Sequence, residues 1–88
     1  MDREPHHRNG VEHWFAGKVY VSALNYTIEN IIIAARDHND ATRRFERRAR
    51  HWTWRDVVCK ETEMMMPLPG ETFEEQKQRL SAEGFLIL

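Results

Sequence analysis

The chain has 88 residues, of which 41% are hydrophobic and 31% charged, and its net charge is −1. This composition is typical of one small globular domain and excludes a disordered tail. No apolar run approaches the roughly 20 residues that a membrane-spanning helix needs, and the single cysteine, Cys59, excludes an internal disulfide.

Residues 1–10 are polar, contain Pro5 and end in the turn dipeptide Asn9-Gly10, so we expect a flexible leader. They lack the apolar segment of a secretory signal. Together with the free thiol, this indicates a cytoplasmic protein without membrane association. We expect the folded part to be one domain over residues 11–88.

The first element of this domain is a strand over residues 12–24. Apolar side chains alternate between residues 18 and 24 with the period of two that a pleated sheet requires, and Gly17 indicates a bulge. Residues 28–36 favour a second strand, because three consecutive β-branched isoleucines suit a strand buried on both faces. The alternative is one helix over residues 27–52, whose apolar residues have heptad spacing.

Residues 37–40 favour the strand, since four poor helix formers in a row are typical of a break and a helix cap. A helix then follows from Asp40 to Trp52, with Asn39 or Asp40 as its N-cap. Its inner, apolar side is expected to consist of Ala41, Phe45, Ala49 and Trp52. Its outer side is expected to carry Arg43, Arg47 and Arg50, flanked by Arg44 and His51.

A third strand is predicted over residues 55–65, followed by a turn at residues 67–70. Thr72 and Glu75 have the spacing of a capping box, which begins a second helix. Gly84 ends that helix in a Schellman motif, in which Leu80 contacts Phe85, and residues 85–88 form a last strand. The fold class is therefore α+β, in ββαβαβ order, with a mixed sheet and two helices on one face.

No motif of catalytic quality is present. Cys59 lies in mid-strand without a helix N-terminus or glycine to stabilise a thiolate, and the histidines near the N-terminus, with no cysteine pair beside them, lack the ligand set of a structural zinc site. There is no glycine-rich phosphate loop and no nucleophile elbow. We therefore expect a protein that is not an enzyme, with no cofactor and no metal.

The charge is distributed unevenly along the chain. Residues 36–55 contain seven basic and three acidic residues, whereas residues 56–88 contain three basic and seven acidic ones. The near-neutral total hides a bipolar molecule, which favours a binding protein with one electropositive face. The candidate binding residues are Arg43, Arg44, Arg47, Arg50, His51 and Trp54.

Residues 40–49, DATRRFERRA, resemble the arginine-rich peptide of the lambdoid phage N antiterminators, which binds a boxB RNA hairpin as a bent helix. The resemblance implies phosphate contacts from Arg43, Arg44, Arg47 and Arg48, with Trp52 as the nearest candidate to stack on a base. It covers about ten residues and departs from the family at Phe45, where the family has arginine. Phe45 lies at the centre of the apolar side, which indicates a helix embedded in a folded domain.

Three interpretations of the basic helix remain at this stage. The leading one is charge-complementary docking onto a host protein or nucleoprotein complex, since the chain is similar in kind to small phage proteins such as anti-CRISPR inhibitors. The second is direct binding of RNA or DNA. In the third, the arginines pair with the acidic residues of the second helix, Glu71, Glu74, Glu75 and Glu83.

Overall fold

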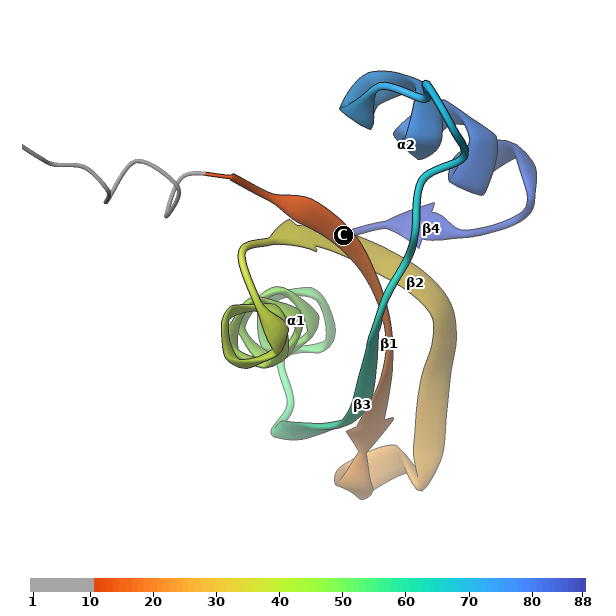
Figure 1. Ribbon diagram of the computed structural model, residues 1–88. Helices are drawn as coiled ribbons and strands as arrows, with labels where there is room; N and C mark the ends of the chain where they lie inside the picture. Colours follow the sequence, from red (N-terminus) through yellow and green to blue (C-terminus); the bar gives the residue numbers. More distant parts are fainter. Residues whose placement is uncertain (1–10) are drawn as a thin grey trace, which may run out of the picture.

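A computed structural model describes residues 11–88, so the predicted leader over residues 1–10 lies outside the described residues. The elements in chain order are β1 (His13–Val21), the short 3₁₀ helix η2 (Ser22–Leu24), β2 (Tyr26–Ala35), α1 (His38–Thr53), β3 (Val57–Met64), α2 (Phe73–Ala82) and β4 (Leu86–Ile87). The four strands form one sheet in the order β3-β1-β2-β4 (Figure 1). β1 is antiparallel to β2 and β3, and β2 is parallel to β4. The predicted ββαβαβ order and mixed sheet are confirmed, and β2 excludes the alternative of one long helix.

The two helices lie on opposite faces of the sheet, so the prediction that both lie on one face is wrong. Phe15 of β1 and Ile33 of β2 belong to the cluster that packs on α1. Trp14 and Ile32, each one residue earlier, belong to the cluster that contains Leu80 of α2. Because successive side chains of a strand point to opposite faces, these neighbours build two separate cores. The isoleucine run is apolar on both faces for this reason.

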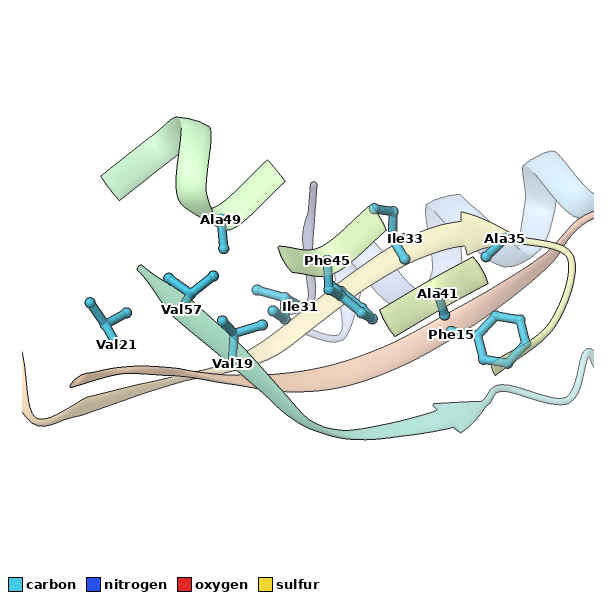
Figure 2. Packing of buried hydrophobic residues seen from close by; sticks show 10 residues of the cluster. All are labelled: Phe15, Val19, Val21, Ile31, Ile33, Ala35, Ala41, Phe45, Ala49 and Val57. Atoms are coloured by element: carbon cyan, nitrogen blue, oxygen red, sulfur yellow. The ribbon is translucent and has the colours of Figure 1, made fainter. Parts of the chain in front are cut away.

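The main core lies between α1 and the sheet (Figure 2). Phe45 is fully buried and lies between Ala41 and Ala49, which are also fully buried. A Cβ atom on Gly17 of β1 would lie only 2.5 Å from the Phe45 ring. The absence of a side chain at Gly17 therefore creates the space that the aromatic ring fills. Alanine on either side of Phe45 brings the helix close to the strands.

The sheet is irregular beside Gly17, as predicted. The register between β1 and β2 shifts between Gly17 and Val19, and that between β1 and β3 shifts between Lys18 and Val19. On β2 the extra residue lies next to Asn30, which has a left-handed φ of 58°. Bulges on both sides of one central strand increase the twist and bend of a sheet. The strands curve around α1 in this region (Figure 1).

Helix α1 begins earlier than predicted. Its N-cap is Asp37, whose side chain accepts a hydrogen bond from the backbone N–H of Asp40, so Asn39 and Asp40 lie within the first turn. At the other end, Trp52 is 55% exposed, and its prediction as a core residue is wrong. Ala49 is the last helical residue of the buried cluster, and Trp52 lies almost one turn beyond it.

Helix α2 begins and ends as predicted. Thr72 and Glu75 form the capping box. At the C-terminus, Gly84 has a φ of 108°, and the backbone N–H of Phe85 donates to the carbonyl of Leu80, as in a Schellman motif. The helix packs on the sheet through Leu80 and through Phe73, which stacks on Trp14. Within residues 11–88, no helix is both long enough and apolar enough to cross a membrane.

Candidate functional site

The candidate site is the solvent-facing side of α1. Arg43, Arg47 and Arg50, here called the outer row, are all exposed, because the opposite side of the helix is packed on the sheet. His51 and Trp54 are also exposed and lie at the C-terminal end of the helix. The structure thus brings five of the six predicted binding residues to one exposed side. Arg44, the sixth, lies apart from them.

Arg44 is half-buried and takes part in an internal network. Its guanidinium donates to the carbonyl of Ala34 at 2.7 Å and to the carboxylate of Glu12 at 3.0 Å. It also lies 3.3 Å from the carboxylate of Asp40. These contacts tie α1 to β2 and to the start of the folded chain. Arg44 is therefore a structural residue, and its positive charge is already balanced.

Asp40 is the anion at the centre of this network. It is buried, and it accepts hydrogen bonds from the backbone N–H and the guanidinium of Arg36. Arg43 lies 3.5 Å away on the exposed side. Burial raises the pKa of Asp40, but the hydrogen bonds from Arg36 and the charge of Arg44 outweigh it, so the pKa lies below its ordinary value. The sequence pattern identified Asp40 only as a capping residue.

The other arginines of α1 differ from Arg44. Within residues 11–88, no carboxylate lies within ion-pair distance of Arg47, Arg48 or Arg50. Glu46, the acidic residue directly before Arg47, accepts a hydrogen bond from the backbone N–H of Cys59 at 2.9 Å and supports β3. Arg47 and Arg50, about one helical turn apart on the exposed side, therefore repel each other, and no carboxylate within residues 11–88 pairs with either to offset this repulsion.

Helix α2 does not supply that anion. The guanidinium of Arg79 in this helix lies 2.7 Å from the carboxylate of Glu71 and 3.2 Å from that of Glu83. Lys77 pairs with Glu74, and Glu75 is held in the capping box. Because the sheet separates the two helices, no ion pair joins α1 to α2 in the part of the chain that the structure describes. The predicted internal pairing of the basic helix with the acidic one is wrong.

The C-terminal end of α1 carries an exposed indole in an unusual backbone conformation. Trp54 is the C-cap residue, with a left-handed φ of 60°, and 86% of it is exposed. Its ring lies beside that of His51, with the centroids 6.2 Å apart. A shallow hollow next to it is lined by Arg50, Arg55, Ser22, Ala23, Trp54 and Asp56. The left-handed conformation could not be predicted from the sequence, because glycine usually occupies such positions.

Cys59, the remaining nucleophile that the sequence analysis considered, is partly buried in β3. Burial raises the pKa of the Cys59 thiol, and the carboxylate of Glu46 acts in the same direction. A thiol of this kind is a poor nucleophile at neutral pH. No group of three histidine, cysteine, aspartate or glutamate side chains within residues 11–88 is placed to hold a metal ion.

Comparisons with protein-family models, with curated proteins and with solved structures found no match to this chain. The case for a function therefore depends on the arrangement of the residues themselves.

Proposed function

We propose that this chain is a small binding protein without enzymatic activity, which docks the outer side of α1 onto an acidic surface of a host protein or nucleoprotein complex. We place it in the cytoplasm and in the class of small phage or mobile-element proteins that act by docking, such as anti-CRISPR inhibitors. The observation that carries the proposal is the contrast in pairing: α2 pairs its charged side chains internally, whereas Arg47, Arg48 and Arg50 of α1 have no carboxylate partner among residues 11–88.

The composition of the exposed side supports docking onto a partner. Arginine and tryptophan are the residues most enriched among those that dominate binding energy at protein interfaces. Here Arg50 and Trp54 line the same hollow, and Trp54 is 86% exposed. An anionic partner would offset the repulsion between the arginines and bury the indole of Trp54. Both effects stabilise a complex more than they stabilise the free protein.

A second candidate function is direct binding of single-stranded RNA or DNA. Trp54 and His51 favour it, because two exposed rings beside Arg50 are suited to stack on an unpaired base while the guanidinium contacts a phosphate. This function predicts an affinity that falls steeply with salt, with a log–log slope of about −0.7 per phosphate contacted on a single strand.

The test of docking is a charge reversal with a matched control. Arg47→Glu/Arg50→Glu removes two exposed cations from α1, and Lys60→Glu/Lys77→Glu makes the same change in net charge elsewhere. Each tagged protein is used to capture partners from a bacterial lysate, with and without nuclease. We expect one stoichiometric protein partner that survives nuclease, is retained by the control and is lost with the α1 variant.

Two other results would change the conclusion. If the α1 variant and the control capture the partner equally well, the outer side of α1 is not the interface. If capture disappears after nuclease treatment, and the purified protein binds single-stranded RNA with the steep salt dependence, the second function replaces the first.

A further inference from the structure

An open groove lies between α1 and the edge of the sheet formed by β4, and its volume is about 460 Å³. Its lining consists of three arginines from α1 and five apolar residues from the strands and the chain beyond β4: Arg44, Arg47, Arg48, Trp14, Ile33, Ala34, Ile87 and Leu88. Ligand sites typically occupy roughly 300–1,000 Å³, so the groove is large enough for an aliphatic side chain and part of its backbone.

The three arginines of the groove differ in their contacts. Within residues 11–88, one is held by hydrogen bonds and ion pairs, and the other two form no ion pair. Arg44 is held by Ala34, Glu12 and Asp40, so it shapes the groove without offering charge. Arg47 and Arg48 are exposed and have no carboxylate partner within residues 11–88. A ligand in this groove therefore meets two unbalanced positive charges on its α1 side.

The floor of the groove is apolar, and its accessible part includes Ile87 and Leu88, whereas Ile33 and Trp14 are only 5% and 4% exposed. Ile87 is 40% exposed although it belongs to a strand, because β4 is only two residues long and lies at the edge of the sheet. The backbone N–H of Leu88 donates to the carbonyl of Ile32, which fixes this part of the floor on β2. Trp14 adds apolar surface only, since its ring is already stacked on Phe73 with the centroids 4.6 Å apart.

This floor suits a protein segment better than a nucleic acid. Bases bind by stacking on free aromatic faces, and the only aromatic ring of the groove has its face engaged by Phe73. An aliphatic side chain, by contrast, gains by leaving water for an accessible apolar surface such as that of Ile87 and Leu88. Acidic neighbours of that side chain would lie within reach of Arg47 and Arg48.

We propose that this groove binds an extended acidic segment of the partner protein, with one aliphatic side chain on the floor over Ile87 and Leu88 and flanking carboxylates on Arg47 and Arg48. The inference rests on the proposed function, with which it shares Arg47. It goes further by identifying the partner as a protein and by adding residues of β4 to the interface.

The test is direct binding of a fluorescent peptide of glutamate and leucine, followed by anisotropy, with a peptide of glutamate and serine as the apolar control. Ile87→Glu places a carboxylate in the groove. Leu86→Glu makes the same change one residue earlier on the same strand, outside the lining. We expect Ile87→Glu to weaken binding of the leucine peptide about 10-fold or more, and Leu86→Glu to leave it unchanged. The serine peptide should bind at least about 10-fold more weakly than the leucine peptide.

Arg48→Ala provides a second variant at an exposed position where the fold is not at risk, and we expect it to weaken the peptide several-fold. If Ile87→Glu and Arg48→Ala both bind the peptide like the wild type, the groove is not its site. If the two peptides bind equally, or if single-stranded RNA competes with them for the groove, the proposed ligand class is wrong. If Arg47→Glu/Arg50→Glu loses the captured partner while Ile87→Glu keeps it, the inference fails and the proposed function stands.

Discussion

Helices α1 and α2 both contain arginine and glutamate, but they differ in what these charges do. In α2, Arg79 joins Glu71, which precedes the helix, to Glu83 at its C-terminus. In α1, only the first turn is arranged in this way, around the buried Asp40. The arginines that follow have no such partner within residues 11–88. Charge in α2 therefore serves the fold, and most of the charge in α1 is available to a ligand.

The two helices also differ in how much of the fold depends on them. α1 covers the larger core, with Phe45, Ala41 and Ala49 fully buried. α2 rests on a smaller cluster around Trp14, Ile32 and Leu80. The helix that presents the unpaired arginines is thus also the one that holds the sheet together. A binding surface on a rigid, well-packed element needs little reorganisation when the ligand arrives.

Shortening one buried side chain in each core measures how much the stability of the fold depends on each helix. We expect Phe45→Ala to lower the free energy of unfolding by about 3–5 kcal/mol, and Leu80→Ala, in the smaller cluster, by about 2–3 kcal/mol. Because a domain of this size has a total stability of about 5 kcal/mol or somewhat more, the first variant should be largely unfolded at 37 °C. Urea titration followed by circular dichroism provides the measurement. Equal losses for the two variants would show that α1 has no special structural role.

A substitution at Gly17 tests the core under α1 separately from that under α2, because an added side chain there would meet Phe45 of α1. We expect Gly17→Ala to lower the free energy of unfolding by about 2–3 kcal/mol, since the added methyl group overlaps the Phe45 ring at 2.5 Å. The matched control is Ala16→Val, which adds carbon to the neighbouring residue on the partly buried α2 side. Thermal unfolding of both variants provides the measurement. If Gly17→Ala is as stable as the wild type, the ring and the helix must be able to move away from β1.

Much of α2 could be predicted from the sequence because its signals are local. The capping box of Thr72 and Glu75, and the Schellman contact between Leu80 and Phe85, are fixed by spacing along the chain. The strand character of the isoleucine run was also local, since β-branched residues disfavour a helix. These elements agree with the structure to within a few residues.

The placement of the helices could not be predicted in the same way. Which face of the sheet a helix covers depends on the alternation of Trp14 and Phe15 and on the partners that each finds across the chain. The role of Arg44 depends likewise on Glu12, which lies far from it in sequence. Spacing on α1 did identify the exposed outer row, but it did not reveal the groove with Ile87, because that groove forms between distant segments.

Asp40 is the anion with which Arg43 and Arg44 pair at the start of α1, whereas the arginines from Arg47 onward have no carboxylate partner within residues 11–88. We expect Asp40→Asn to lower the free energy of unfolding by about 1.5 kcal/mol at neutral pH, because it removes the charge that holds Arg36 and Arg44. The pKa of Asp40 is lowered in the folded protein, so its stabilising effect is complete at neutral pH and is lost as the pH falls below about 4. Urea titrations between pH 7 and about pH 3 should therefore converge for wild type and variant at the acid end.

The control for this experiment is Glu74→Gln, which makes the same carboxylate-to-amide change at an exposed pair with Lys77. We expect a change below about 0.5 kcal/mol, as is usual for surface ion pairs. If the stability difference between wild type and Asp40→Asn does not shrink toward acid pH, the ionised carboxylate is not what stabilises the first turn of α1.

Among the test variants, substitution of Trp54 is expected to change the free energy of unfolding least, and to raise it where the others lower it. A left-handed φ of 60° costs a tryptophan about 1 kcal/mol more than a glycine, so Trp54→Gly should leave the free energy of unfolding unchanged or raise it by up to about 1 kcal/mol. Trp52→Gly, the same substitution inside the helix, should lower it by about 1 kcal/mol. Trp54→Gly also removes the exposed indole beside Arg50, so it should weaken capture of the partner, whereas Trp52→Gly, on the other side of the helix from Arg50, should not. If Trp54→Gly gains stability and loses binding, the tryptophan is kept at a strained position because of the surface it offers a ligand. If it destabilises the fold as Trp52→Gly does, the contact with His51 holds the helix end, and the outer row of arginines must account for binding without it.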